Sequence, residues 1–148
     1  MSLSNRNYEI KVGLDSLDFP FIYDFLTHSY WSECISPSRL RRAMENSINV
    51  GVFSDGIQIG YARVISDKAT FAYLCDVFVA ESARGLGAAK FMLLSILDMP
   101  DLQGIKRFSL VTKDAHSLYR NLGWLPLKNP SMHMEIDRTG IYKLLNEF

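Results

Sequence analysis

One stretch organises the chain: Leu74-Cys75-Asp76-Val77-Phe78-Val79-Ala80-Glu81-Ser82-Ala83-Arg84-Gly85-Leu86-Gly87-Ala88-Ala89-Lys90-Phe91-Met92. It predicts a buried strand, a short turn that holds two glycines, and the first turns of an amphipathic helix. Gly85 and Gly87 lack Cβ atoms, so the backbone can bend tightly there and a ligand can approach closely. The N–H groups at the start of the helix point toward the turn and favour an anion such as a phosphate. A plain strand-to-helix turn explains the same two glycines, and the stretch alone does not separate these alternatives.

The spacing around the two glycines excludes two common phosphate-binding motifs. A P-loop needs Lys followed by Ser or Thr after its last glycine, whereas Gly87 is followed by Ala88-Ala89. A dinucleotide-binding fold needs three spaced glycines and an acidic residue roughly 20 residues later on a second strand, and neither is present. The turn therefore belongs to neither of these classes of nucleotide-binding protein.

The composition excludes several classes of protein and of site. The chain has 148 residues, of which 48% are hydrophobic and 22% are charged, and its formal net charge is zero. We expect one domain over residues 1–148, no nucleic-acid partner because basic residues are not in excess, and no membrane span because no apolar run approaches about 20 residues. Residues 1–6 lack the apolar core of a signal peptide, and two cysteines, Cys34 and Cys75, exclude a disulfide framework. We therefore expect a cytoplasmic location.

Apolar periodicity and turn residues predict the other elements. Strands are expected at residues 8–12, 48–53, 57–65, 70–79, 108–112, 124–127 and 132–136, and helices at 19–31, 37–46, 88–99, 115–121 and 141–145. Ser36 and Asp114 are the expected N-caps of two helices, and Asp55-Gly56 predicts a tight hairpin. The three strands that lead to the glycine turn are expected to be antiparallel because their links are short. The strand at 108–112 follows a helix, so it is expected to run parallel to the central strand.

A second motif lies downstream of the glycine turn: Asp114-Ala115-His116-Ser117-Leu118-Tyr119-Arg120-Asn121-Leu122-Gly123-Trp124. It resembles motif B of the GNAT family of N-acetyltransferases, in which a helix carries Leu-Tyr-x-x-x-Gly-Phe/Trp. The strand end Val77-Phe78-Val79 and the turn from Ser82 to Gly87 resemble motif A of the same family, and the order of elements agrees over nearly the whole chain. The chain departs from the family pattern at Ser82, where Gln or Arg is usual, and at Thr112, where Asn is frequent. Tyr30-Trp31, Arg63 and Asp67 look closest to a small bacterial-type branch of the family.

This resemblance implies a fold and a cosubstrate. The implied fold is α/β of the α+β kind, with a mixed, mostly antiparallel central sheet flanked by helices and a β-α-β unit that binds the cofactor. The implied cosubstrate is acetyl-CoA, with no metal. Its pyrophosphate is expected on backbone N–H groups of the turn, with charge added by an arginine, and its pantetheine arm is expected along the strand end. The expected cofactor-binding residues are Val77, Phe78, Val79, Ala83, Arg84, Gly85, Leu86, Gly87, Ala88, Thr112, Asp114 and Tyr119.

The resemblance also implies direct transfer of an acetyl group to an amine in a ternary complex. Tyr119, the motif B tyrosine, is the expected acid for the departing thiolate, and a half-buried helix tyrosine is the alternative interpretation. A backbone N–H near Val77 is expected to polarise the thioester carbonyl. Asp76 is a carboxylate in an otherwise apolar strand, so it is either the catalytic base or the partner of Arg63 on a neighbouring strand. The weaker candidates for the base are a chain of waters, Glu33, His116 and His133.

The expected acceptor pocket combines aromatic rings and charged side chains. Rings and acids of this kind suit a small cationic amine, and the implied acceptor is a small molecule or an amine of a protein. The alternative, from another class of protein, is a non-catalytic module that senses acyl-CoA or docks onto a partner. Edge strands at both ends of the chain suggest a homodimer. The expected pocket residues, next to Asp76, are Tyr30, Trp31, Glu33, Arg63, Asp67 and Tyr73.

Overall fold

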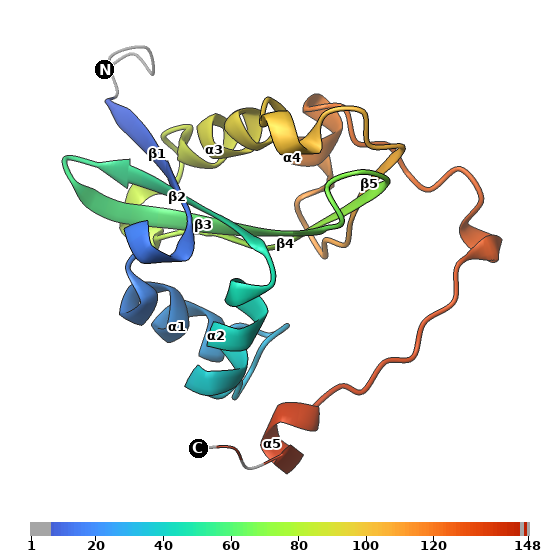
Figure 1. Ribbon diagram of the computed structural model, residues 1–148, viewed down its shortest axis with the longest axis horizontal. Helices are drawn as coiled ribbons and strands as arrows, with labels where there is room; N and C mark the ends of the chain where they lie inside the picture. Colours follow the sequence, from blue (N-terminus) through green and yellow to red (C-terminus); the bar gives the residue numbers. More distant parts are fainter. Residues whose placement is uncertain (1–6, 146, 148) are drawn as a thin grey trace.

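A five-stranded sheet forms the centre of the protein (Figure 1). The structure, a computed structural model, describes residues 7–145 and 147, so the N-terminal segment 1–6 lies outside the described residues. The strands follow one another across the sheet in chain order, and they are β1 (Tyr8–Val12), β2 (Ile48–Ser54), β3 (Ile57–Ser66), β4 (Phe71–Val79) and β5 (Arg107–Leu110). The pairs from β1 to β4 are antiparallel, and β5 runs parallel to β4. The expected mixed, mostly antiparallel sheet is therefore confirmed.

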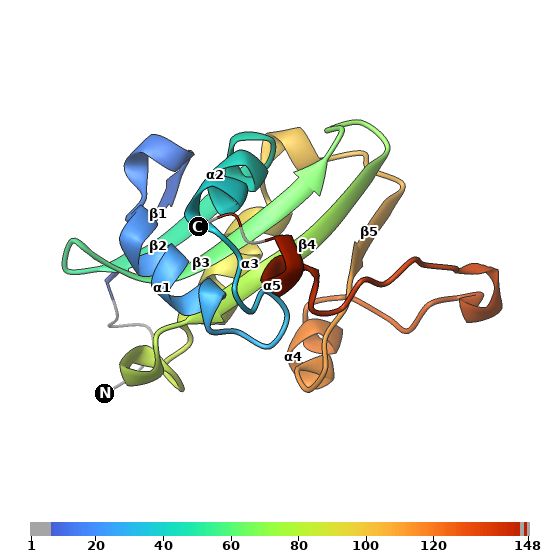
Figure 2. The same ribbon diagram turned by 90° about the horizontal axis from the view of Figure 1, so that it is seen from below.

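Helices cover both faces of the sheet (Figures 1 and 2). Helices α1 (Phe19–Thr27) and α2 (Pro37–Glu45) lie on one face, and α3 (Ala88–Leu97) and α4 (His116–Asn121) lie on the other. A short fifth helix, α5 (Ile141–Leu145), follows a long irregular segment and lies on the same side as α1 and α2. In the residues that the structure describes, 3-10 turns occur at Leu14–Ser16, Glu81–Ala83, Pro100–Leu102 and Pro130–Met132.

Two apolar cores result from this arrangement, one on each face of the sheet. The larger core packs α3 against β2, β3 and β4, with Met92, Leu93 and Ile96 fully buried. The second core packs α1 and α2 against the opposite face, where it surrounds Tyr61 and Phe78. Burial of apolar surface on both faces is the main stabilising contribution to such a layered fold.

The N-terminal caps explain where the first two helices begin. The Asp18 side chain accepts a hydrogen bond from the N–H of Phe21, and Ser36 accepts one from the N–H of Arg39, so the expected Ser36 cap is confirmed. Helix α1 ends at Thr27 rather than Trp31, because the chain turns back and the N–H of Cys34 donates to the carbonyl of Thr27 at 3.0 Å. The two aromatic residues that follow α1 therefore lie on a loop.

A β-bulge at Asp76 reverses the faces of β4. Tyr61 pairs with Phe78 and Arg63 pairs with Cys75, so two residues of β4 face a single residue of β3. Asp76 itself has a φ of 54°, a left-handed backbone angle that residues other than glycine rarely adopt. Before the bulge Leu74 packs into the core beneath α3, whereas after it Phe78 packs into the core beneath α1 and α2. The bulge thus places Asp76 on the same face as Arg63.

Three predictions for the C-terminal part are wrong. The segments at 124–127 and 132–136 are not strands, because within residues 7–145 and 147 no strand pairs with the outer edge of β5. Residues 125–140 instead form an extended segment, here named the C-terminal arm, that projects from the body before α5 (Figure 1). Asp114 does not cap α4; Thr112 Oγ1 accepts from the N–H of Ala115 at 3.1 Å and orders the entry to the helix.

Candidate functional site

Strands β4 and β5 separate halfway along β4. They pair over Phe71–Leu74 and Arg107–Leu110, and β4 then continues for five residues, to Val79, with no strand on that side among the described residues. The backbone N–H and C=O groups on the open side of this segment are available to an extended ligand that carries amides of its own. The opening lies between the end of β4 and α4, which carries Leu118 and Tyr119.

The glycine turn follows directly at the end of β4. A single 3-10 turn, Glu81–Ala83, leads the chain to Gly85 and Gly87, whose φ values are 78° and 87°. Side chains rarely adopt such left-handed angles, so glycine is required there for the backbone to reverse. Gly87 is also the N-cap residue of α3, and it starts the helix without a side-chain cap.

Unused N–H groups converge at the start of α3. The N–H groups of Ala83 and Arg84 bond to carbonyls of the turn at 2.8 and 3.3 Å. By contrast, among the described residues no protein group accepts from the N–H groups of residues 85–90. These donors stand at the positive end of the dipole of a ten-residue helix. The arrangement can bind an anionic group such as a diphosphate.

A groove of about 220 Å³ lies over these donors. A Cβ atom added to Gly85 would meet no atom within 4 Å, so the groove is open on that side. Arg84 folds back along it, and its Nε donates to the carbonyl of Val79 at 3.0 Å. Arg84 and Lys90 therefore bring two positive charges to the groove. Its lining residues are Val79, Ala83, Arg84, Gly85, Gly87, Ala88, Ala89, Lys90 and Leu118.

Six of the expected cofactor residues line this groove, and the others lie elsewhere. Val77 is on the strand before it, whereas the side chain of Phe78 packs beneath α1 and α2. The carbonyl of Leu86 accepts a hydrogen bond from the Tyr8 hydroxyl at 2.9 Å, which ties the turn to β1. Asp114 is exposed before α4. Thr112 and Tyr119 line a second cavity, of about 680 Å³, between β5, α4 and the start of the C-terminal arm.

Tyr119 is the buried residue of α4. Its ring packs edge-on against Trp124, with 5.7 Å between ring centroids. Burial, assisted by the nearby Tyr30, raises the pKa of the Tyr119 hydroxyl to about 12. Within the described residues no protein group bonds to this hydroxyl, so a buried donor is left for a ligand.

Asp76 joins three separate elements. Its Oδ2 accepts from Nε of Arg63 at 2.8 Å, and its Oδ1 accepts from the indole N–H of Trp31 at 2.9 Å. Arg63 also donates from Nη1 to the Ser47 hydroxyl at 3.0 Å. The structure thus pairs Asp76 with Arg63, one of the two alternatives left open by the sequence. The bonds to Trp31 and Ser47 were not predicted, because they join residues far apart in the chain that show no shared pattern.

Most of the expected acceptor residues gather on the α1–α2 side of β4. Trp31 packs edge-on against Tyr30, with centroids 5.0 Å apart, and Lys113 Nζ lies 5.3 Å from the centre of the Tyr30 ring. Tyr73 is half-buried on β4, and burial raises its pKa. Glu33 is exposed and forms an ion pair with Lys143 of α5 at 3.3 Å.

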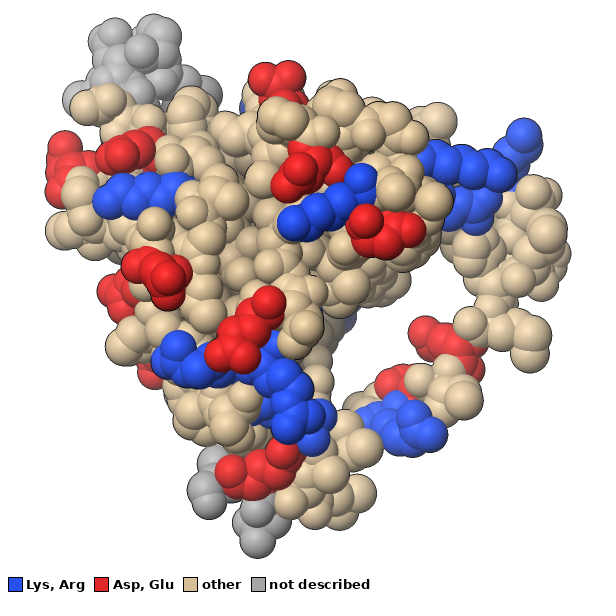
Figure 3. All heavy atoms as spheres, viewed as in Figure 1, with Lys and Arg blue, Asp and Glu red and all other residues tan. Residues whose placement is uncertain are grey.

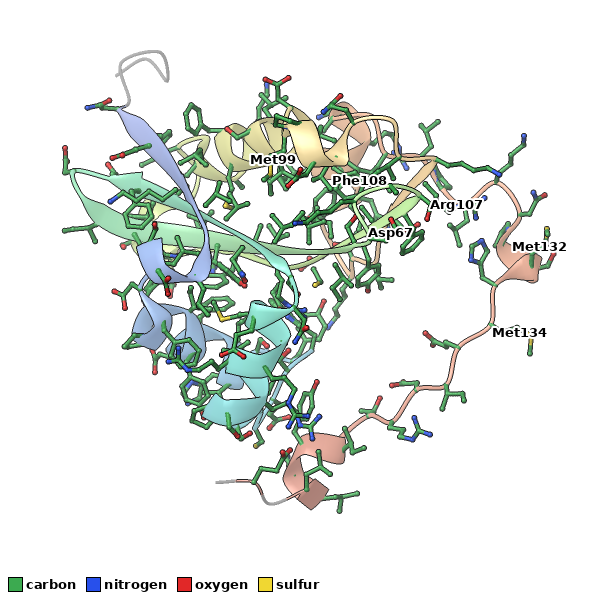
Figure 4. All side chains as sticks on the ribbon, viewed as in Figure 1. Asp67, Met99, Arg107, Phe108, Met132 and Met134 are labelled. Carbon is green, nitrogen blue, oxygen red and sulfur yellow. The ribbon has the colours of Figure 1, made fainter. Side chains whose placement is uncertain are left out.

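Asp67 does not join this group. It lies in the turn between β3 and β4, near the start of β5 (Figure 4). Its carboxylate accepts from the hydroxyl and N–H of Thr70 and from the N–H groups of Ala69 and Phe71. These bonds lower the pKa of Asp67, and the bond from the Thr70 hydroxyl contributes most. The side chain therefore orders the turn.

The described part of the chain holds neither a cluster of metal ligands nor a membrane-spanning helix. No cluster of three or more His, Cys, Asp or Glu side chains in residues 7–145 and 147 could hold a metal ion. No helix in the described part of the chain is both long and apolar enough to span a membrane.

Comparison with known proteins places the chain in a family. The model of the acetyltransferase (GNAT) family matches residues 14–124. A crystal structure of a GNAT-family protein from Xanthomonas campestris pv. campestris is 41% identical, with a TM-score of 0.89, and the match covers 92% of this chain and 96% of that chain. A Gibberella zeae protein named "putative acetyltransferase" is 37% identical over 70 residues, which are 45% of this chain. The match spans 38% of the length of that curated relative.

A more distant structure shows the same fold. It is that of a Clostridium acetobutylicum acetyltransferase with acetyl-CoA, 14% identical, with a TM-score of 0.65, covering 88% of this chain and 96% of that chain. The family match covers both the glycine turn, whose free N–H groups follow the open edge of β4, and the α4 motif, which carries the buried Tyr119. This chain therefore belongs to the GNAT family of acetyltransferases.

Proposed function

We propose that the protein is an acyltransferase that moves an acetyl group from acetyl-CoA to the amine of a small molecule, by direct transfer in a ternary complex. The observation that carries this proposal is the set of unused N–H groups at residues 85–90, next to the unpaired end of β4. A ligand that carries a diphosphate joined to a chain with amide groups matches both features. The diphosphate matches the N–H groups, and the chain matches the unpaired end of β4. The acetyl-CoA bound to the Clostridium acetobutylicum protein of the same fold supports this choice of ligand.

The residues of the groove and of the open strand edge fit two adjacent parts of acetyl-CoA, the diphosphate and the pantetheine arm. The N–H groups of residues 85–90 would hold the diphosphate, and Arg84 and Lys90 would add positive charge. The open edge of β4 from Cys75 to Val79 would bond to the pantetheine amides, as an added strand does. Because the pantetheine amides would bond to main-chain groups of β4, the side chains of this segment can be apolar. The bound cosubstrate would supply the activated acetyl group.

Tyr119 is the proposed proton donor for the departing thiolate. With a pKa raised to about 12, its hydroxyl stays protonated throughout the neutral range. A thiol has a pKa of about 8.5, so complete proton transfer from the phenol is uphill and a hydrogen bond to the developing thiolate is the main contribution. A backbone N–H near Val77, on the open edge, is the proposed group that polarises the thioester carbonyl.

Asp76, or a water that it holds, is the proposed base. Both carboxylate oxygens already accept one bond, from Trp31 and from Arg63, but each has a second lone pair. The acceptor amine would lie against Trp31 and Tyr30, with Tyr73 and Glu33 nearby, because ring faces and carboxylates attract a cation. Cys34 and Cys75 form no disulfide, so a cytoplasmic location is part of the proposal.

Two measurements test the proposal. Isothermal titration with acetyl-CoA is expected to show one site per chain, and the absence of heat at millimolar ligand contradicts the binding site. Free thiol release is then measured with a panel of amines: polyamines, amino acids, aminoglycosides and a lysine-containing peptide. Turnover of at least one small amine supports the enzyme. Binding without any turnover instead supports the non-catalytic sensor of acyl-CoA.

A homodimer is also part of the proposal. Strands β1 and β5 are the edges of the sheet, and exposed edges favour association between chains.

A further inference from the structure

Two polar groups on the α1–α2 side of the sheet have no protein partner in the described part of the chain. Arg63 donates from Nε to Asp76 at 2.8 Å and from Nη1 to the Ser47 hydroxyl at 3.0 Å, but within residues 7–145 and 147 nothing accepts from its Nη2. The hydroxyl of Tyr73, a half-buried residue, is likewise without a partner among these residues. Because polar groups inside a protein are normally bonded, both donors are available to a ligand.

The sheet register places these two donors on one face. Arg63 of β3 pairs with Cys75 of β4, and Ile65 of β3 pairs with Tyr73 of β4. Residues paired in this way, and residues two apart along a strand, lie on the same face of the sheet. Exposure increases along this face: Tyr61 is fully buried, the Arg63 side chain is 15% exposed and Ile65 is 43% exposed. Arg63 and Tyr73 therefore lie where the cover by α1 and α2 ends.

This part of the face opens toward the C-terminal arm. Figure 3 shows an open gap between the arm and the body, on the side of the sheet that α1 and α2 cover. Among the causes that act on the pKa of Tyr73, burial is the largest and Glu135 of the arm is the smallest. The arm therefore adds little negative charge beside Tyr73.

The ion pair of Arg63 and Asp76 presents both of its charges to a ligand. Nη2 of Arg63 can donate a charge-assisted hydrogen bond to a carboxylate, to which the Tyr73 hydroxyl can add a second bond. Both oxygens of Asp76 keep a lone pair that can accept from an amine. A ligand with one positive and one negative group, close together, matches this arrangement better than a simple cation does.

We propose that the acceptor is a free α-amino acid, whose carboxylate binds Nη2 of Arg63 and the Tyr73 hydroxyl while its amine faces Asp76. This inference rests on the proposed acetyl transfer and names its substrate class. In an α-amino acid the amine and the carboxylate are attached to one carbon, so their short separation suits the adjacent charges of a single ion pair. Amines of a folded protein lack a free carboxylate at this position, so they are excluded as preferred acceptors.

The carboxylate orients the acceptor and takes no part in bond making. In the reaction the amino nitrogen forms a bond to the acetyl carbon, and the carbon–sulfur bond breaks. One proton of the amine ends on the CoA thiol, so the products are an N-acetylated amino acid and free CoA. Arg63 and Tyr73 are thus proposed as residues that bind the acceptor, and Asp76 keeps its proposed role as the base.

Matched pairs of ligands test the substrate class with the natural chain. Each common L-amino acid is compared with its own carboxamide, which has nearly the same shape but no negative charge. Binding in the presence of CoA is measured by isothermal titration, and kcat/KM by thiol release. For the amino acid that binds best, both are expected to exceed the values of its carboxamide by about 10- to 100-fold. 6-Aminohexanoate, whose charges are far apart, is expected to bind no better than the carboxamides.

Two conservative variants test the residues. Tyr73→Phe removes the hydroxyl alone, and Arg63→Lys keeps a positive charge beside Asp76 but lacks Nη2. Each is expected to lower the preference for the amino acid to about one tenth and to leave the carboxamide unaffected. Tyr142→Phe, in the core beneath α1 and α2, is the control and is expected to keep the full preference. Circular dichroism checks the fold, and Tyr73→Phe decides if Arg63→Lys does not fold.

The outcomes separate this proposal from the proposed acetyl transfer. Equal binding and equal turnover of amino acids and carboxamides overturn the amino acid as substrate, while acetyl transfer stands. Binding that requires the carboxylate, without turnover of any amine, supports the carboxylate site and contradicts the transferase. A preference that stays unchanged in both variants overturns the assignment to Arg63 and Tyr73, and the absence of binding by any amino acid overturns the proposal as a whole.

Discussion

Asp76 shows how one backbone irregularity creates a site. Its positive φ inserts an extra residue into β4 and turns the carboxylate toward Arg63, which is 13 residues away in the chain, and Trp31, which is 45 residues away. The carboxylate thereby connects the sheet to the loop after α1. The loop that presents the proposed acceptor-binding rings is thus positioned by a buried charge.

Replacement of Asp76 by Asn is expected to lower the free energy of unfolding by about 3–5 kcal/mol. The side chains of Arg63 and Asp76 are only 15% and 5% exposed, so the variant leaves a guanidinium charge largely buried without its counter-charge. Urea denaturation measures the change. Asp24, whose side chain is 85% exposed, is the matched control, and Asp24→Asn is expected to change stability by less than about 0.5 kcal/mol. Equal effects in the two variants contradict a structural role for the ion pair.

Replacement of Tyr119 by Phe is expected to lower kcat about 100-fold with an amine that the enzyme accepts, because the variant loses the proposed proton donor. The hydroxyl bonds to no protein group among the described residues, so packing and acetyl-CoA affinity are expected to stay nearly unchanged. Stopped-flow measurement of thiol release gives the rate and isothermal titration the affinity. Tyr142→Phe, beneath α1 and α2, is the control. An undiminished kcat removes Tyr119 from the mechanism.

At the scale of elements, the sequence pattern predicted the features that depend on residues close together in the chain. The hairpin at Asp55-Gly56, the cap at Ser36 and the strands β1 to β4 depend on neighbouring residues, and they were found close to the expected bounds. The bulge at Asp76 depends on pairing with β3, which the sequence of β4 alone does not contain. The segment 132–136 has the pattern of a strand but no partner within the described part of its chain, and a strand does not form without one.

The same distinction applies to the site. The groove at the start of α3 could be predicted because one continuous stretch builds it. Asp67 was assigned to the acceptor pocket because a carboxylate suits a cationic amine, yet its carboxylate orders a turn at the other end of β4. The bond from Trp31 to Asp76 could be found only from the three-dimensional arrangement.

Replacement of Gly87 by Glu tests the turn as an anion-binding element. The new carboxylate would stand against the proposed diphosphate position, so acetyl-CoA affinity is expected to fall at least 100-fold in isothermal titration. Gly104 is the matched control, since its φ of 76° is close to the 87° of Gly87 and a Cβ atom there has free space. Gly104→Glu carries the same backbone strain away from the groove, so its affinity is expected to be that of the natural chain. Equal affinities in both variants exclude the groove as the binding site.

At the scale of the whole molecule, the sheet separates two cores and the proposed reaction lies where it opens. The proposed cofactor groove lies on the side of α3 and α4, and the proposed acceptor residues lie on the side of α1 and α2. We propose that the two ligands meet at the end of β4 that β5 does not pair with. Two ligands that approach from opposite faces can therefore meet without either crossing a core.

Alkaline pH is expected to destabilise the folded chain through its buried acids. Burial raises the pKa of Cys75 from 9.0 to about 12, so the thiol keeps its proton in the folded state at a pH where the unfolded chain has lost it. Its contribution to stability is complete below pH 9 and is lost as the pH rises toward 12. The difference in unfolding free energy between the natural chain and Cys75→Ala, measured in urea at pH 8 and pH 11, is expected to shrink at pH 11. A difference that does not change with pH contradicts the raised pKa.

The short pairing of β4 with β5 has a consequence for hydrogen exchange. Along β4, amides that point toward β3 have a partner strand before and after the bulge at Asp76, whereas those that point the other way have a partner strand only as far as Leu74. In deuterated solvent, the amides between Cys75 and Val79 that face β3 and those that face the open side are therefore expected to differ in protection by orders of magnitude. A ligand bound along the open edge would slow hydrogen exchange of the amides on that side and leave exchange of the amides that face β3 unchanged. The labelling pattern of these five residues therefore reports whether the ligand is bound.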